Sequence, residues 1–171
     1  MSQPPPPVER YDTELFGGGR GEVSLRALPP GEPQRLGPVF AGIDPWARLG
    51  YPAEAISGYL GTLEKSAPRY AIMVGGEVAA VAGVRLNWLR GPYVQFLGVL
   101  PSYQKRKLGS AFLAWLAHEA KRHGEHNVWV LASNFNAGAL RFYAANGFEK
   151  TGEIADLVAS GTSEVLMRRR L

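Results

Sequence analysis

The chain is 171 residues long, a length that suits one domain with its own hydrophobic core. Hydrophobic residues make up 46% of it and charged residues 20%, a balance that excludes an intrinsically disordered protein. Nineteen basic residues against fifteen acidic residues give a formal net charge of +4. The chain has no cysteine, which excludes disulfides, thiolate metal sites and a cysteine nucleophile.

The beginning of the sequence predicts a flexible arm ahead of the folded domain. Residues 1–21 combine a run of prolines with three successive glycines, Gly17–Gly19, and lack the basic-then-apolar order of a signal peptide. No apolar run in the chain approaches the ~20 residues of a membrane helix. We therefore expect a cytoplasmic protein with an arm over 1–21 and one domain over 22–171.

The rest of the chain alternates between strand and helix patterns. Residues 108–122 show the clearest helical spacing, with Leu108, Phe112 and Trp115 on one face. In chain order we predict a strand at 23–28, weak helical character at 32–49, a helix at 53–65, strands at 70–74, 77–88 and 93–100, the 108–122 helix, a strand at 128–131, a helix at 136–146 and an antiparallel pair at 148–158 and 162–170. This order predicts an α/β domain whose mixed, mostly antiparallel sheet of six to seven strands is flanked by about four helices.

The segment between Val99 and Ala111 is the most informative about function. A strand end, a basic loop and the N-terminus of an amphipathic helix follow one another directly, and unpaired N–H groups at such an N-terminus receive phosphate well. The basic run 105–107 adds three positive charges, and Gly109 would let a ligand approach the backbone closely. From this segment alone, a solvated basic loop ahead of an ordinary helix fits equally well.

Two motifs in this chain resemble those of the GNAT family of N-acetyltransferases, over roughly residues 69–170. The first, which resembles the family's acetyl-CoA-binding motif, is Val99-x-Pro101-x-Tyr103-Gln104-x-x-Lys107-x-Gly109-Ser110-Ala111. The second, which resembles the family's later helix motif, is Asn136-x-x-Ala139-x-x-x-Tyr143-x-x-x-Gly147-Phe148. One departure stands out, because Lys107 occupies the place of the family's usual first glycine. The resemblance implies a GNAT-like domain over 22–171.

The resemblance also implies where acetyl-CoA, the acyl donor, would bind. Its pyrophosphate would lie on the backbone amides from about Gln104 to Ser110, and its pantetheine arm would run beside the 93–100 strand. The implied cofactor-binding residues are Leu97, Val99, Gln104, Lys105, Arg106, Lys107, Leu108, Gly109, Ser110 and Asn136. For Asn136, capping of the following helix is an equally good interpretation. No metal is implied.

Tyr143 is the catalytic candidate, because the matching tyrosine of the family can protonate the departing thiolate of CoA. The alternative is an aromatic side chain on the core face of its helix. A general base is not identified, since residues 78–118 contain no Asp or Glu. A water chain, a carboxylate such as Glu54 or Asp44, and an already neutral amine all stay open.

These observations favour an N-acetyltransferase that moves an acetyl group from acetyl-CoA to a primary amine by direct transfer in a ternary complex. The acceptor would be a small-molecule or peptide amine, with no nucleic acid and no membrane as partner. The sequence leaves monomer and homodimer open. Two alternatives remain: a non-catalytic acyl-CoA-binding or sensing module of the same fold, and a basic nucleic-acid-binding protein that uses 105–107 and Arg168–Arg170.

Overall fold

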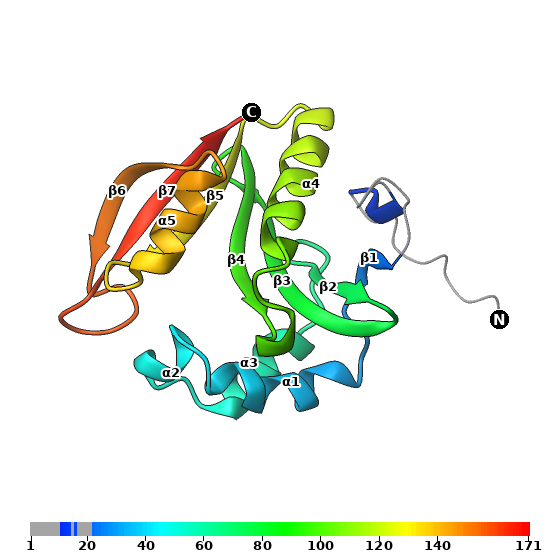
Figure 1. The fold of residues 1–171 in the computed structure, drawn as a ribbon. Coiled ribbons are helices and arrows are strands. Elements are labelled where there is room, and N and C mark those ends of the chain that lie inside the picture. Colours follow the sequence, from blue (N-terminus) through cyan, green and yellow to red (C-terminus); the bar gives the residue numbers. More distant parts are fainter. Residues whose placement is uncertain (1–10, 15, 17–21) are drawn as a thin grey trace.

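A computed structural model describes residues 11–14, 16 and 22–171 as a single twisted sheet with helices on both faces (Figure 1). The strand order is β1-β2-β3-β4-β5-β7-β6, and all neighbours are antiparallel except β4 and β5. The strands are β1 (Val23–Ala27), β2 (Arg69–Val74), β3 (Glu77–Trp88), β4 (Gly91–Val99), β5 (Asn127–Ser133), β6 (Glu149–Ala155) and β7 (Ser163–Arg170). This confirms the predicted α/β class and its mostly antiparallel sheet.

The helices differ from the prediction mainly in the first third of the chain. The region of weak helical character, 32–49, forms two separate helices, because the chain leaves the first at Gly42 and Pro45 precedes the second. The helices are α1 (Glu32–Ala41), α2 (Trp46–Leu49), α3 (Ala53–Gly61), α4 (Leu108–Arg122) and α5 (Ala137–Ala145), with a 3₁₀ turn at Pro101–Tyr103. The third helix stops four residues short of its predicted end at 65.

Two apolar layers cover the two faces of the sheet. On one face α4 and α5 pack against the strands through buried residues such as Phe112, Leu116 and Tyr143. On the other face α1 and α3 pack through Leu36 and Leu60, among others. The sheet therefore separates a face covered by α4 and α5 from a face covered by α1–α3.

A β-bulge interrupts β4 near its middle. Val94 pairs with Val84 of β3, whereas Phe96 pairs with the preceding β3 residue, Gly83, so Gln95 is an extra residue on β4. A bulge of this kind bends its strand and increases the local twist. It lies next to the place where β4 leaves its other neighbour.

The parallel pairing of β4 with β5 is short. It consists of Tyr93 with Trp129 and Val94 with Val130, after which the two strands diverge (Figure 1). Beyond Val94, the edge of β4 that faces β5 has no strand partner among the described residues. An edge of unpaired N–H and C=O groups can pair with an extended ligand.

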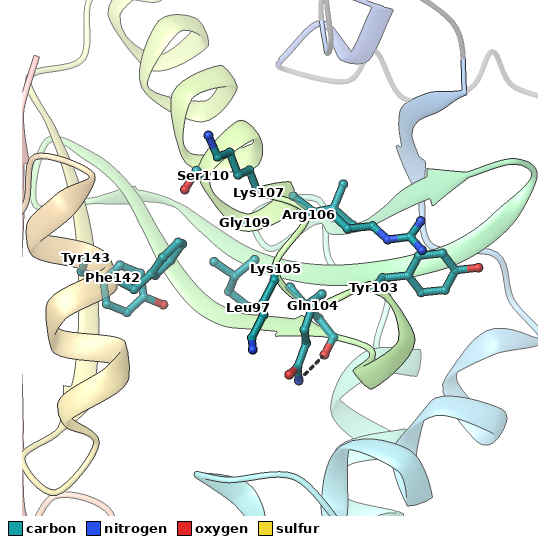
Figure 2. Close-up of a pocket in the computed structure, with 12 residues that line it drawn as sticks. Leu97, Tyr103, Gln104, Lys105, Arg106, Lys107, Gly109, Ser110, Phe142 and Tyr143 are labelled. Atoms are coloured by element: carbon teal, nitrogen blue, oxygen red, sulfur yellow. Dashed lines mark hydrogen bonds between the residues drawn. The ribbon is translucent and has the colours of Figure 1, made fainter.

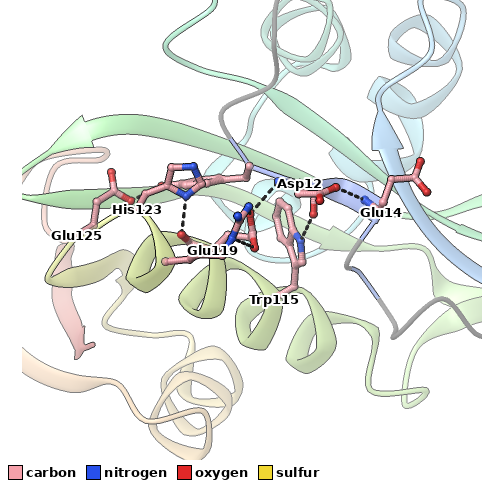
Figure 3. Close-up of polar contacts among 8 residues, drawn as sticks. Asp12, Glu14, Trp115, Glu119, His123 and Glu125 are labelled. Atoms are coloured by element: carbon pink, nitrogen blue, oxygen red, sulfur yellow. Dashed lines mark hydrogen bonds and ion pairs between the residues drawn. The ribbon is translucent and has the colours of Figure 1, made fainter.

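The first described residues pack against the outer side of α4 (Figure 3). The indole N–H of Trp115 donates to the carbonyl of Asp12 at 2.9 Å, and the Asp12 amide donates to the fully buried Glu119 carboxylate at 2.8 Å. Arg122 donates two hydrogen bonds to the same carboxylate, at 3.0 and 2.8 Å. Its guanidinium holds the pKa of Glu119 below the usual value.

These contacts correct part of the predicted flexible arm. Tyr11 is fully buried and Phe16 is 3% exposed, and both belong to the core cluster through ring contacts with Trp115 of α4. Burial of their large aromatic rings stabilises this segment, although the residues around them are mostly prolines and glycines. The other residues assigned to the arm, 1–10, 15 and 17–21, lie outside the described residues. Within the described part of the chain, no helix is long and apolar enough to cross a membrane.

Candidate active site

A cavity of about 400 Å³ lies between the second half of β4, the loop after it, the start of α4 and one side of α5 (Figure 2). Its lining combines apolar, basic and tyrosine side chains and contains no acidic residue. The lining residues are Leu97, Val99, Tyr103, Gln104, Lys105, Arg106, Lys107, Leu108, Gly109, Ser110, Phe142 and Tyr143. Of the cofactor-binding residues and the catalytic tyrosine proposed from the sequence, all but Asn136 line this cavity.

The N-terminus of α4 forms one end of the cavity. Lys107 is its N-cap residue and supplies no side-chain cap, and the first turn carries no acidic side chain. The N–H groups of Leu108, Gly109 and Ser110 precede the first helical hydrogen bond, which Ala111 donates to the carbonyl of Lys107 at 3.0 Å. With the helix dipole, this end of the cavity suits an anionic group.

Lys107 adopts a backbone conformation that usually belongs to glycine. Its φ of 59° and ψ of 22° lie in the left-handed region, and Lys105 two residues earlier has a φ of 64°. A side chain in this region costs roughly 1 kcal/mol. The backbone at this position is thus one that a glycine, the usual residue of the resembled motif, adopts without strain, and Lys107 adds a cation.

The three basic side chains of the loop lie differently. All three are exposed, but the guanidinium of Arg106 lies 5.2 Å from the ring centre of Tyr103, on the side away from α5 (Figure 2). Lys105 and Lys107 carry no ion pair among the described residues. Their charges therefore remain available to a phosphate-bearing ligand.

The unpaired edge of β4 forms the floor of the cavity. Leu97 and Val99 line it from the face that α4 and α5 cover. The Gln104 side-chain amide lies 3.5 Å from the Val99 carbonyl, the contact drawn in Figure 2. At that length the contact is weak, so a ligand could displace it.

Gly109 leaves room for a neighbouring aromatic ring. A Cβ at this position would lie 2.9 Å from Cζ of Phe142 and 3.8 Å from Cδ2 of Leu97. The ring of Phe142 therefore rests directly against the first turn of α4. Phe142 occupies the space that a side chain at Gly109 would fill. The lack of a side chain would also let a ligand come close to the backbone amides of this turn.

Tyr143 reaches the cavity from α5. It is 8% exposed, its ring lies between those of Phe142 and Phe148 at centroid distances of 5.2 and 5.6 Å, and its hydroxyl is turned toward the cavity (Figure 2). Among the described residues it makes no hydrogen bond through that hydroxyl. Burial raises the pKa of Tyr143 above that of a free tyrosine, so it carries its proton at neutral pH.

Asn136 serves α5 as a helix cap. Its side-chain oxygen accepts a hydrogen bond from the amide of Ala139 at 3.1 Å, and it does not line the cavity. This is the capping role that the sequence left open. The other two polar candidates lie apart as well: Asp44 accepts from the Arg48 amide at 3.1 Å at the start of α2, and Glu54 is exposed in the first turn of α3.

Sequence reasoning missed two residues that line the cavity, Tyr103 and Phe142. Tyr103 belongs to the first motif, and its ring lies beside the guanidinium of Arg106. Phe142 directly precedes Tyr143 on α5, and its contact with Gly109 is a tertiary one that no local spacing reveals.

Comparison with known proteins identifies the family. The model of the acetyltransferase (GNAT) family matches residues 38–148, well over half of the chain. The chain belongs to the GNAT family. The matched range contains the basic loop, α4 and the whole of α5, and so holds every residue that lines the cavity.

Solved GNAT structures share the fold at low sequence identity. A GNAT-family protein from Desulfovibrio desulfuricans superposes with a TM-score of 0.71 at 17% identity, covering 86% of this chain and 98% of that one. The ribosomal-protein-S18-alanine N-acetyltransferase from Escherichia coli gives 0.70 at 17% identity, over 86% and 93% of the two chains. A GNAT family acetyltransferase from Elizabethkingia anophelis, solved with acetyl-CoA bound, gives 0.67 at 16% identity, over 89% and 100%.

Replacing Lys107 by glycine is expected to separate the conformational cost of this residue from its charge. Relief of the left-handed side chain should raise the free energy of unfolding by about 1 kcal/mol in urea titrations. Loss of the cation should weaken acetyl-CoA binding by about two- to fivefold in calorimetry, as expected for one exposed charge. Lys107→Gln is the matched control, since it should weaken binding equally without raising stability. A glycine variant no more stable than the glutamine variant would contradict this explanation.

Proposed function

We propose that this GNAT protein is an N-acetyltransferase that moves the acetyl group of acetyl-CoA directly to a primary amine in a ternary complex. One observation carries the proposal: a single cavity brings together an uncapped helix N-terminus, the unpaired edge of β4 and the hydroxyl of Tyr143. The first suits the pyrophosphate of acetyl-CoA, the second the amides of its pantetheine arm, and the third a leaving thiolate.

In this proposal, separate parts of the site bind the phosphates and the pantetheine arm of acetyl-CoA. The amides of Leu108–Ser110 and the cations at 105 and 107 would hold the phosphates, and the Leu97 and Val99 backbone would align the pantetheine arm. The thioester belongs to acetyl-CoA and is already activated, so positioning an amine against it supplies much of the rate. The chain has no cysteine that could carry the acetyl group, and direct attack by the amine needs no such acyl-enzyme.

Tyr143 would act on the sulfur as the C–S bond breaks. A tyrosine with a raised pKa is a weaker acid than an ordinary thiol, whose pKa is about 8.5. It therefore stabilises the developing thiolate first by a hydrogen bond. Complete transfer of its proton is favourable once the phenolate can take a replacement proton from the amine nitrogen.

An acceptor screen tests the proposal. With acetyl-CoA and a panel of primary amines, including alkylamines, benzylamine, spermidine and peptides with a free N-terminus, we expect amine-dependent release of thiol and a product 42 Da heavier than one of the amines, the mass of an acetyl group replacing hydrogen. The non-catalytic acyl-CoA module predicts acetyl-CoA binding without thiol release for any amine. Calorimetry with acetyl-CoA accompanies the screen and separates the two.

A further inference from the structure

Glu164 is a buried carboxylate on the face of the sheet opposite α4 and α5. It lies on β7 and is 6% exposed, and its neighbours Val165 and Met167 belong to the core under α4. It pairs across the sheet with Ser133 of β5, whose hydroxyl donates to the carboxylate at 2.7 Å. Ser133 lies on β5 beyond Val130, the last residue of that strand that pairs with β4. Glu164 is therefore at the part of the sheet where β4 and β5 have separated.

No cation neutralises Glu164 among the described residues. Arg85, which with Glu164 influences Tyr93, pairs with Glu64 at 3.5 Å, and Arg168 of the same strand lies over the Trp129 ring at 5.7 Å. The hydroxyl of Ser133 is the hydrogen-bond donor that the structure gives to the carboxylate. A buried carboxylate is costly unless it is paired, so an unpaired one calls for a partner that the chain itself does not provide.

Glu119, the second buried carboxylate of the described residues, is fully paired. It accepts two hydrogen bonds from Arg122 and one from the Asp12 amide, all on the outer side of α4. That arrangement joins the segment at Asp12 to α4 and gives the carboxylate a cationic partner. Glu164 lacks each of these partners.

Tyrosine side chains connect Glu164 to the candidate active site. The pKa of Tyr93 on β4 is raised to about 12, chiefly by burial and to a smaller extent by Tyr59 and Glu164, while Arg85 acts to lower it. Tyr93 in turn contributes, after burial, to the raised pKa of Tyr143. Tyr93, which lies at the short β4–β5 pairing, is thus near enough to interact with Glu164 on one side and with Tyr143 on the other. Tyr51 is the remaining titratable group that acts on Tyr93.

We propose that Glu164 is the group that binds the protonated amine of the acceptor and takes its first proton. The inference rests on the proposed acetyl transfer and supplies the general base that the sequence leaves open. Ser133 is a positioning residue, because it fixes one carboxylate oxygen by its hydrogen bond and leaves the other for the ammonium group.

The protons balance as follows. The ammonium gives one proton to Glu164, and the neutral amine nitrogen then attacks the carbonyl carbon of the thioester. The C–N bond forms, the C–S bond breaks, and the sulfur receives a proton from Tyr143. The phenolate takes the second proton from nitrogen, and Glu164 releases the first to solvent. The sum is an amide, a free thiol and one proton.

Glu164→Gln tests this role, because it keeps the shape and the hydrogen bond from Ser133 but loses the charge. With a primary alkylamine found in the acceptor screen, kcat/KM at pH 7 should fall by about 10²–10⁴-fold. Acetyl-CoA affinity in calorimetry should stay unchanged. The deficit should shrink toward pH ~10, where an alkylammonium loses its proton in solution. A purely structural role would not produce this pH-dependent recovery.

Two further variants complete the experiment. Glu153→Gln is the matched control, an exposed carboxylate on the adjacent β6 that pairs with Lys150, and it should leave kcat/KM unchanged. Glu164→Asp keeps the charge on a shorter side chain and should retain more activity than Glu164→Gln. If the glutamine variant fails to fold, the aspartate variant decides alone: its kcat/KM deficit at pH 7 should also shrink toward pH ~10, and a deficit that does not change with pH overturns the inference. Wild-type-like turnover by Glu164→Gln overturns this inference alone. If the wild-type protein binds acetyl-CoA but acetylates no amine, the proposed function fails and the inference with it.

Discussion

Replacing Gly109 by glutamate is expected to abolish acetyl-CoA binding. The new side chain would start 2.9 Å from the ring of Phe142, so either it or the ring must enter the cavity. Its negative charge would also lie at the helix N-terminus, beside the amides that would hold the pyrophosphate. Steric exclusion and charge repulsion act together, and we expect affinity measured by calorimetry to fall more than ~100-fold, a loss of about 3 kcal/mol.

Two other variants make that result interpretable. Gly109→Ala adds only the Cβ and should reduce affinity less, since Phe142 needs to shift without a charge entering the site. Gly58→Ala is the control for a glycine in a helix, because no atom lies within 4 Å of its added Cβ, and it should leave binding unchanged while stabilising α3. Undiminished acetyl-CoA binding by a folded Gly109→Glu protein would show that the ligand lies elsewhere.

Replacing Tyr143 by phenylalanine is expected to reduce kcat by about 10²–10⁴-fold at saturating acetyl-CoA. The ring would keep its packing against Phe142 and Phe148, so the loss would be that of the hydroxyl alone. Because burial raises the pKa of Tyr143, the hydroxyl stays protonated as the pH rises through the ordinary tyrosine value of 10. Its ionisation should therefore cause no loss of wild-type activity between pH 7 and pH ~10.

The matched control is a buried tyrosine outside the cavity. Tyr70 on β2 is 2% exposed and contacts Phe112 and Trp115, so Tyr70→Phe should change stability but not kcat. Acetyl-CoA binding by Tyr143→Phe should stay close to that of the wild-type protein. Unchanged turnover in Tyr143→Phe would rule out the hydroxyl as a participant in the reaction.

The parts of the site that the sequence predicts are those built from neighbouring residues. The loop at 104–107 and the first turn of α4 are contiguous, and Tyr143 stands at a helical spacing from the start of α5. Their arrangement follows from local rules for helix starts and apolar faces. For the sheet, the sequence predicts only the class, mixed and mostly antiparallel. The strand order cannot be predicted, because pairing between distant strands leaves no periodic signal.

The parts that escape prediction depend on contacts between distant segments. In the sequence, Glu164 is one polar residue of a predicted strand, with nothing to mark it as buried. Its partner Ser133 lies on another strand, 31 residues away. Tyr11 follows shortly after a run of prolines, yet it is fully buried and packs against Trp115 of α4. Phe142 and Gly109 are matched in size across two helices. In each case a tertiary contact, and not a local preference, decides what the residue does.

The extra residue in β4 also decides which side chains meet the cavity. Side chains of an uninterrupted strand alternate strictly, so counting on from Val94 would place Phe96 and Gly98 under α4. Gln95 reverses that count: Phe96 instead joins Phe40 and Trp46 on the other face, and Leu97 and Val99 reach the cavity. One inserted residue thus exchanges the two surfaces of half a strand, giving an aromatic surface to one side of the sheet and an aliphatic floor to the other.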